Sequence, residues 1–370
     1  MESQHTYPSG TVLLMVSTKR GLFLVSSRDR RNWEVEATAL GGRTFNAALD
    51  QRTGKRLFAA ENGDFFGSFL RYSDDFGATW REPERGIEFS EASGRKLTNL
   101  WVIEPGRASE PDTIYLGVDP ASLWISRDGG VTWDINAGLE AHPTRAEWNP
   151  GNGGLCLHSI VLDYANPQRM WVGISAVGCM RTEDGGQTWV HANTGTRADF
   201  NPEPYPEYGQ CIHRVLQHPT EPDKLYQQNH CGVYKTANAG TEWIDIQRDL
   251  PRDQTSVFGF PIALDVHHPE TVYVIAEGGE RHNFGQQFTV YRTRDAGDSW
   301  EPLHEGLPAG EGVRLGVLRH GMSADTLDPC GVYVGTNTGQ LFASDNRGDA
   351  WKLIADYLPP IYSVNAAVIV

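Results

Sequence analysis

An eight-residue motif recurs seven times along the chain and constrains the fold more than any other feature. Its full form is Ser/Thr-x-Asp-x-Gly-x-Ser/Thr-Trp, and we call each copy a box turn. The four copies that keep every position begin at Ser73, Ser126, Thr182 and Thr293. Two looser copies, beginning at Thr236 and Ser344, have Asn in place of Asp, and the copy from Ser26 to Trp33 keeps little beyond its ends and Asp29.

Each position of the motif has a physical role in a tight turn. The Asp or Asn side chain caps backbone N–H groups of its own turn, Gly supplies a positive φ, and Trp packs between neighbouring sheets. The seven tryptophans stand at positions 33, 80, 133, 189, 243, 300 and 351, so successive copies are 47 to 57 residues apart. This spacing suits one four-stranded sheet per copy, and the box turn is therefore interpreted as a structural fastener.

The strand pattern around the boxes predicts a closed ring of sheets. Each box follows two strand-like runs joined by a turn, and a third run precedes these, which gives an inner strand A, then B, C, the box and an outer strand D. The chain, however, begins with B-type and C-type runs at residues 12–17 and 21–26. Residues 364–368 resemble the inner strand at residues 45–49, so we expect residues 364–370 to complete blade 1 and close the ring.

The predicted fold is thus all-β: a single seven-bladed β-propeller over residues 1–370, with four-stranded antiparallel blades and a flexible segment at residues 1–10. The boxes resemble the Asp-box, or BNR, repeats of the sialidase-like propellers in the WD40-YVTN-BNR-like superfamily, and the resemblance covers nearly the whole chain. Sialidases have six blades, an arginine triad, a Tyr nucleophile paired with Glu, and an Asp acid/base. This chain has seven boxes and lacks the Arg-Ile-Pro motif of the first arginine, so it is not a true sialidase by motif.

Other propellers suggest three further functions, through the repeats or, for the lyases, through residue types on the same face. Xyloglucan-type hydrolases use two such propellers with catalytic aspartates across the cleft between them, whereas paired-carboxylate hydrolysis within one propeller needs two acids about 5–10 Å apart. Glu61 and Asp119, on neighbouring blades 2 and 3, are the candidates for such a pair. Some seven-bladed polysaccharide lyases abstract a proton with His and Tyr. Photosystem II assembly factors and sortilin-like receptors, in contrast, bind peptides or proteins.

Charge and cysteine content limit the partners and the location. The formal net charge is −15 and no basic stripe is present, so we expect no nucleic-acid partner. No run of about 18 apolar residues and no leader-like N-terminus is found, so we expect a cytoplasmic protein with no membrane partner. The five cysteines are scattered, which favours reduced thiols over a disulfide scaffold.

The longest predicted loops lie on the face opposite the boxes, and this loop-rich face is where we expect the site. The inner strands of blades 4 and 5 begin with Cys-Leu-His and Cys-Ile-His, which place His158 and His213 near the mouth of the central channel, and the B-to-C loop of blade 5 adds His230. The predicted catalytic residues are His158, His213, His230, Tyr208 and Arg314. The predicted substrate-binding residues are Glu61, Asn99, Asp119, Trp148 and Glu277.

Two interpretations of the three histidines stay open. Imidazole titrates near neutrality and binds zinc or copper, so the histidines could act as acid and base or hold a divalent metal on His158, His213 and His230. The sequence has no close-spaced CxxC or HxxxH motif that would support a bound metal. Alternatively, they are hydrogen-bonded polar residues at a water-filled axis.

The sequence favours a hydrolase or lyase acting on a sugar-like or small polar substrate in a His-containing pocket on the loop-rich face. The partner is then a small molecule or glycan. The alternative is a non-catalytic binding or assembly scaffold that uses the same face for a protein or peptide.

Overall fold

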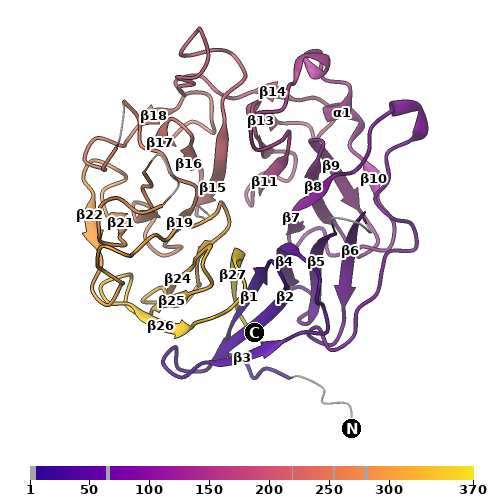
Figure 1. Cartoon of the computed structure of the whole chain (residues 1–370). Coiled ribbons are helices and arrows are strands. Elements are labelled where there is room, and N and C mark those ends of the chain that lie inside the picture. The colour runs from indigo at the N-terminus through magenta and orange to yellow at the C-terminus, as the bar shows by residue number, and fades with distance from the viewer. Residues whose placement is uncertain (1–5, 64–66, 219, 253–254, 279–281) are drawn as a thin grey trace.

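Seven antiparallel sheets are arranged in a ring around one axis (Figure 1). The structure is a computed structural model that describes residues 6–63, 67–218, 220–252, 255–278 and 282–370. Six of the sheets have four strands and the seventh, β4-β5-β6, has three, with an isolated bridge between Tyr72 and Arg81 in the place of its outer strand. The predicted seven-bladed propeller is confirmed.

The strands follow the order predicted for each blade, from the inner strand to the outer one. Blade 1 contains β27 (Ile361–Val368), β1 (Val12–Thr18), β2 (Gly21–Ser27) and β3 (Glu34–Ala37), and blade 2 contains β4 (Thr44–Asp50), β5 (Arg56–Gly63) and β6 (Gly67–Ser73). Blade 3 contains β7 (Asn99–Pro105), β8 (Ile114–Asp119), β9 (Ser122–Ser126) and β10 (Asp134–Ile135). Blade 4 contains β11 (Leu157–Leu162), β12 (Met170–Ile174), β13 (Gly178–Thr182) and β14 (Val190–His191).

The last three blades repeat the same order. Blade 5 contains β15 (Ile212–His218), β16 (Glu221–Asn229), β17 (Gly232–Thr236) and β18 (Ile244–Asp245). Blade 6 contains β19 (Ile262–Leu264), β20 (Val272–Val274), β21 (Val290–Thr293) and β22 (Glu301–Leu303), and blade 7 contains β23 (Met322–Ala324), β24 (Val332–Gly335), β25 (Leu341–Ser344) and β26 (Lys352–Ala355). Short helical segments, η1 (Glu91–Ser93), α1 (Ala137–Glu140) and η2 (Arg145–Glu147), lie in the loops. No helix among the described residues is both long and apolar enough to cross a membrane.

The C-terminal strand closes the ring as predicted. β27 pairs antiparallel with β1, and Val12 lies opposite Val368. The pairing puts residues 364–368 in the register that the comparison with residues 45–49 predicts, because Val368 and Leu49 lie opposite Val12 and Leu57, the partners of the first box residues Ser27 and Ser73. The bulge in β27 falls at Tyr362, two residues nearer the start of the strand than the bulge at Phe45 of β4.

The box turns are closed by the hydrogen bonds that the motif predicts. In the copy at Ser126, the hydroxyl accepts from the Gly130 amide at 2.8 Å and Asp128 Oδ1 accepts from the Thr132 amide at 2.9 Å. The first copy begins at Ser27 and not at Ser26, because Ser27 Oγ donates to Asp29 at 3.1 Å.

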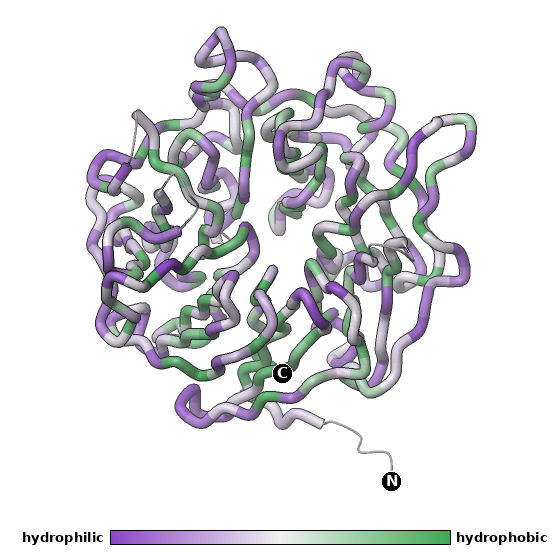
Figure 2. The backbone as a smooth tube through the Cα atoms, in the orientation of Figure 1, coloured by the Kyte–Doolittle hydropathy of each residue, from purple (hydrophilic) through white to green (hydrophobic). Residues whose placement is uncertain are grey.

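The box tryptophans join neighbouring blades. Trp243 Nε1 donates to the carbonyl oxygen of Ala192 in blade 4 at 2.8 Å, and Trp300 Nε1 donates to that of Ile246, which follows the outer strand of blade 5, at 2.7 Å. In Figure 2 the strands carry most of the hydrophobic residues, whereas many of the peripheral loops are hydrophilic. At the N-terminus, Tyr7 packs edge-on against Phe76 with ring centroids 5.0 Å apart.

One segment before blade 7, residues 315–321, reaches across the axis, and we call it the strap. His320 Nε2 donates to the carbonyl oxygen of His158 in blade 4 at 2.7 Å. Arg214 of blade 5 donates to the carbonyl oxygens of Arg319 and Met322 at 3.4 and 2.8 Å. Blade 7 is therefore bonded to blades 4 and 5 as well as to its neighbours in the ring.

Candidate functional site

Five inner strands carry a β-bulge near the start of the strand, on the loop-rich face. The bulged residues, which we call the mouth ring, are Tyr362, Phe45, Trp101, His158 and His213 in blades 1 to 5. A bulge redirects a side chain away from the regular alternation of a strand. Phe45 lies 4.9 Å from Trp101 and 5.0 Å from Tyr362 between ring centroids, and all three are partly exposed. The mouth of the channel thus presents an aromatic surface.

Arg319 of the strap lies at the mouth ring and is partly buried. Its guanidinium carbon is 5.5 Å from the ring centroid of Trp101 and 5.3 Å from that of Phe260. Its Nη2 also donates to Ser175 Oγ at 3.4 Å. Arg319 is therefore a cation at the mouth, and it contacts blades 3, 4 and 6.

Arg314, the arginine predicted as a catalytic residue, makes contacts only within its own loop among those described. Its side chain is exposed and donates to the carbonyl oxygens of Glu311 and Val313 in its own loop. The sequence argument placed Arg314 on an inner strand, but the inner strand of blade 7, β23, begins at Met322. The strap between them has no strand-like alternation that could have revealed its course.

Side chains from the B-to-C loops hold the strap in place. Glu277 Oε1 accepts from the Val317 amide at 2.7 Å, and this predicted substrate-binding residue is only 1% exposed. Asn283 and Asn337 accept in the same way from the amides of Leu315 and Gly316, each at 3.0 Å. The structure thus gives Glu277 a positioning role two residues from Arg319.

Asp119 and Asn99 lie opposite each other at the mouth ends of β8 and β7. Burial raises the pKa of Asp119 to about 6, although a hydrogen bond from Asn99 acts in the opposite direction. Gly154 allows its own loop to lie close to Asp119, since a Cβ on this residue would be 3.0 Å from Asp119 Oδ2. On the neighbouring blade, Glu61 forms an ion pair with Arg71 at 2.9 Å.

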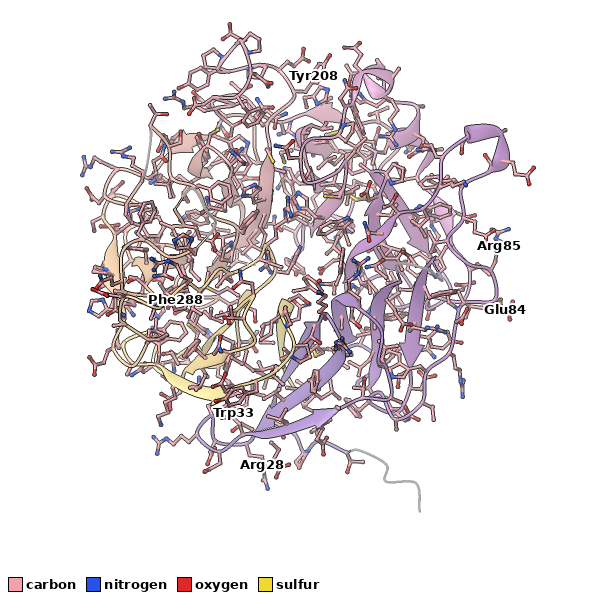
Figure 3. The ribbon with its side chains drawn as sticks, in the orientation of Figure 1. Arg28, Trp33, Glu84, Arg85, Tyr208 and Phe288 are labelled. Carbon is pink, nitrogen blue, oxygen red and sulfur yellow. The ribbon has the colours of Figure 1, made fainter. Side chains whose placement is uncertain are left out.

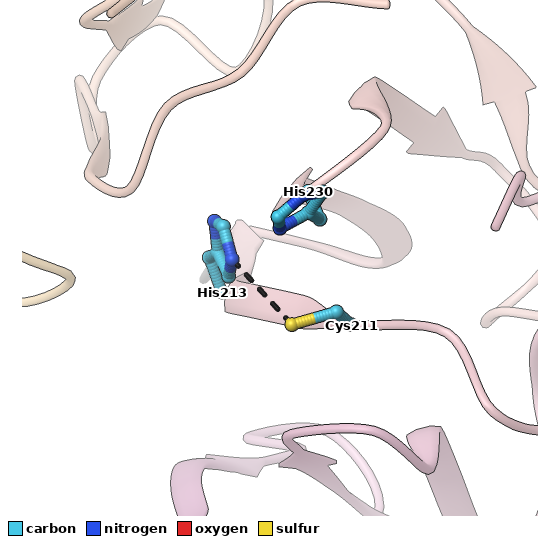
Figure 4. A group of neighbouring side chains, drawn as sticks. All are labelled: Cys211, His213 and His230. Atoms are coloured by element: carbon cyan, nitrogen blue, oxygen red, sulfur yellow. Dashed lines mark hydrogen bonds between the residues drawn. The ribbon is translucent and has the colours of Figure 1, made fainter. Parts of the chain in front are cut away.

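Cys211, His213 and His230 form a compact cluster at the mouth end of blade 5 (Figure 4). Their thiol and imidazole ligand atoms all lie within 4.8 Å of one another, and Cys211 Sγ is 3.6 Å from His213 Nε2. His213 Nδ1 donates to the carbonyl oxygen of Gly259 at 2.5 Å. Two of the three predicted histidines are therefore brought together, with a cysteine that was not assigned to the site.

His158 lies outside this cluster, so the three predicted histidines do not come together, and the third member of the cluster is Cys211. The side chain of His158 is fully buried, and its Nδ1 is 3.2 Å from Ser159 Oγ. Burial, together with the nearby positive charge of Arg319, lowers the pKa of His158 well below its usual range. His158 is thus a neutral, enclosed member of the mouth ring.

Tyr208 and Trp148 make contacts away from the cluster. The Tyr208 hydroxyl donates to Glu147, its ring stacks on His191 with centroids 4.8 Å apart, and Figure 3 shows Tyr208 at the outer part of the disc. Trp148 is 7% exposed and belongs to the hydrophobic core between blades 3 and 4. The aromatic side chains that contact one another at the mouth come instead from the bulged inner strands.

A cavity of about 190 Å³ lies among the inner strands and is lined by Glu104, Arg214 and His320, among others. Burial raises the pKa of Glu104 to about 7 and lowers that of Arg214 to about 10. His320, also desolvated, has a pKa lowered to about 3. Sequence reasoning did not single out these groups, although Glu104 is a charged residue within the apolar inner strand β7.

Comparisons with known proteins show sequence and fold similarity without establishing a family. No family model matches the chain. An oligoxyloglucan-reducing end-specific xyloglucanase of Emericella nidulans is 23% identical over 304 residues, which are 73% of this chain and 35% of that protein. A xyloglucanase of Hypocrea jecorina is 20% identical over 351 residues, which are 87% of this chain and 38% of that protein. The chain spans little more than a third of the length of these curated relatives.

Solved structures give the same fold. A GH74 enzyme of Niastella koreensis superimposes with a TM-score of 0.64 at 17% identity, over 93% of this chain and 52% of that one. An ancestral GH74 enzyme gives a TM-score of 0.58 at 16% identity, over 85% and 39% of the two chains. These similarities support the propeller architecture.

Proposed function

We propose that this protein is a glycoside hydrolase that acts on a glycan bound at the mouth ring. The observation that carries the proposal is Asp119, a carboxyl whose pKa is raised to about 6 beside the mouth. A general acid must still hold its proton at the pH at which it donates it, and a carboxyl with a pKa of about 6 does so over a wider pH range than an ordinary Asp. The curated relatives, both named as xyloglucanases, make xyloglucan fragments the first substrates to test.

The mouth ring supplies a surface that suits a sugar. Tyr362, Phe45 and Trp101 form a continuous aromatic strip, and the apolar face of a sugar ring packs well on such rings. Arg319 adds hydrogen-bond donors beside Trp101. The strip binds and orients the substrate, and the polar groups around it fix which hydroxyls face the acid.

In the proposed step, Asp119 donates its proton to the glycosidic oxygen while the bond from that oxygen to the anomeric carbon breaks. The departing sugar leaves as an alcohol that carries this proton. A water molecule adds to the anomeric carbon and gives one of its protons to a second carboxylate. We assign Glu61 to this role because it lies at the mouth end of the neighbouring blade. Proton exchange with solvent then returns both carboxyl groups to their starting states.

Hydrolysis of xyloglucan oligosaccharides by the full chain tests the proposal. Asp119→Asn is expected to lower kcat by about 100-fold or more with little change in oligosaccharide binding. Glu84→Gln, at an exposed rim position, is the control and keeps full activity (Figure 3). Turnover that survives in Asp119→Asn at the wild-type rate would refute the assignment.

The alternative is a binding protein without turnover, for a glycan or for a protein or peptide partner. It is favoured by the firm attachment of the strap through Glu277 and Asn283, which makes the mouth a preformed surface. Saturable oligosaccharide binding without product formation at any pH would support this alternative. Binding of a peptide but of no oligosaccharide would support the protein partner.

A further inference from the structure

The cluster of Cys211, His213 and His230 has the donor set of a transition-metal site. One thiol and two imidazoles are ligands that zinc and copper prefer over the oxygen-binding ions magnesium and calcium. All three ligand atoms lie within 4.8 Å of one another, although they come from the start of β15 and from the β16–β17 turn. The donors therefore converge from two separate pieces of chain.

The distance between two of the donors fits a bound ion. A tetrahedral zinc ion with Zn–S of about 2.3 Å and Zn–N of about 2.05 Å separates its sulfur and nitrogen ligands by about 3.6 Å. Cys211 Sγ and His213 Nε2 are 3.6 Å apart. His230 needs to move by about an ångström to complete the set, which a side-chain rotation provides.

The surroundings of His213 orient one ring nitrogen toward that point. Nδ1 carries the proton that it donates to the Gly259 carbonyl at 2.5 Å, so Nε2 presents its lone pair toward Cys211. This arrangement, a second hydrogen bond that fixes the tautomer, accompanies most metal-bound histidines. Gly259 can lie this close to Ile275 because it has no side chain. A Cβ on it would be 2.2 Å from the carbonyl oxygen of Ile275.

Aromatic rings and the backbone hold the two histidines. Phe260 stacks on His213 with centroids 4.5 Å apart, and Phe258 packs edge-on against His230 at 4.9 Å. The His230 amide donates to the carbonyl oxygen of Cys211 at 2.9 Å, which fixes the turn directly over the cysteine. Preorganised donors of this kind lose little freedom when an ion binds.

We propose that Cys211, His213 and His230 bind one zinc-type transition-metal ion at the mouth of the channel. Binding displaces the thiol proton of Cys211, which is released to solvent, while both imidazoles bind in their neutral form. Cys211 and His230 are partly exposed, so the fourth position is open to water or to a ligand at the mouth. This inference does not rest on the proposed hydrolase activity.

Metal content and thiol protection test the site directly. The full chain is loaded with zinc, dialysed and assayed by elemental analysis, together with Cys211→Ser and His230→Asn. We expect wild type to retain one zinc per chain, and each variant to bind zinc at least about 100-fold more weakly. Zinc should also slow the alkylation of Cys211 by iodoacetamide, followed by peptide mass spectrometry.

Two matched variants serve as controls. Cys231→Ser removes the adjacent thiol, whose sulfur accepts from the Asp199 amide, and His191→Asn removes a half-buried histidine of the Tyr208 stack. Both should bind zinc as wild type does. Near-ultraviolet circular dichroism checks that every variant is folded. Equal zinc affinity in wild type and Cys211→Ser, or alkylation of Cys211 at the same rate with and without zinc, would overturn the proposal.

Discussion

The guanidinium carbon of Arg319 lies 5.5 Å from the ring centroid of Trp101, although the two residues belong to blades on opposite sides of the axis. The contact depends on the backbone course of the strap, which Glu277 fixes at Val317. A cation over an aromatic face is stabilised electrostatically, and the indole is the strongest partner. The strap therefore holds Arg319 in place at the mouth of the channel.

Arg319→Gln should weaken the binding of a xyloglucan oligosaccharide by about tenfold, because a charged hydrogen-bond donor is lost beside Trp101. The backbone bonds of the strap do not involve this side chain, so the strap should keep its course, and the unfolding temperature should fall only by what the cation–π contacts and the bond to Ser175 contribute. Isothermal titration calorimetry measures the affinity, with the exposed Arg314→Gln as control. A larger loss in Arg314→Gln than in Arg319→Gln would contradict this account of the mouth.

The pH dependence of turnover should follow the protonation of Asp119. A general acid works in its protonated form, so kcat/KM should fall by about tenfold per pH unit above the pKa of about 6. Asp119→Asn should abolish this descending limb together with the activity. Initial rates measured between pH 4.5 and 8 provide the check, and a rate that rises across that range would exclude Asp119 as the acid.

The fold was predictable from sequence because the hydrogen bonds that shape each box turn are local. Ser126, Asp128 and Gly130 make local hydrogen bonds whose partners lie within a few residues, so their spacing alone identifies a turn and counts the blades. The closing strand was also recognisable as a copy of an inner strand. Its register was predicted as well, whereas the bulge at Tyr362 was not, because nothing in the sequence marks it.

The site was only partly predictable, because its decisive contacts are not local. His213 and His230 were placed together from the B-to-C hairpin, and the structure adds Cys211 from the same tripeptide. Arg319 was missed because it reaches its partners through an irregular segment held by Glu277. Trp148 was misjudged because its exposure depends on how α1 and its flanking loop pack on blade 4.

Glu104 should make stability depend on pH. Its pKa is about 7 in the folded chain and near the ordinary value of 4.5 in the unfolded chain, so between these pH values the folded state holds a proton that the unfolded state has lost. The free energy of unfolding should therefore fall as pH rises from 4.5 to 7, by on the order of 2–3 kcal/mol from this group. Urea unfolding of Glu104→Gln should show a smaller decline than wild type. Glu84→Gln should match wild type, and equal slopes in all three would contradict the assignment.

The two positive-φ residues of a box turn should respond to substitution in opposite directions. Ala296 has φ 57° and Gly297 has φ 91°, and a Cβ on Gly297 would lie 2.5 Å from Ile246 Cβ. Gly297→Ala should destabilise the protein by at least about 2 kcal/mol through strain and collision. Ala296→Gly should instead be neutral or stabilising by about 0.5 kcal/mol. Chemical denaturation distinguishes the two, and equal losses would show that the local geometry is not the cause.

Removal of residues 361–370 should open the ring. β27 covers one edge of β1, and its buried Ile361 and Val364 pack in the core with Val12 and Leu14. Their loss exposes an apolar strand edge that favours aggregation. Size-exclusion chromatography and near-ultraviolet circular dichroism should show aggregation and loss of fixed tertiary structure. Deletion of Val370 alone, which is 88% exposed, is the control. A soluble truncated monomer with native melting would show that the ring does not need this closure.

The strap has a consequence for how the molecule unfolds. Tandem-repeat proteins in which each unit contacts only its neighbours lose their repeats progressively from the ends. Here hydrogen bonds link residues 105 and 162 positions apart, from Arg214 to Arg319 and from His320 to His158. Detachment of blade 7 therefore breaks bonds to blades 4 and 5 as well as those to its neighbours in the ring. We expect the seven repeats to unfold together as one cooperative unit rather than one blade at a time.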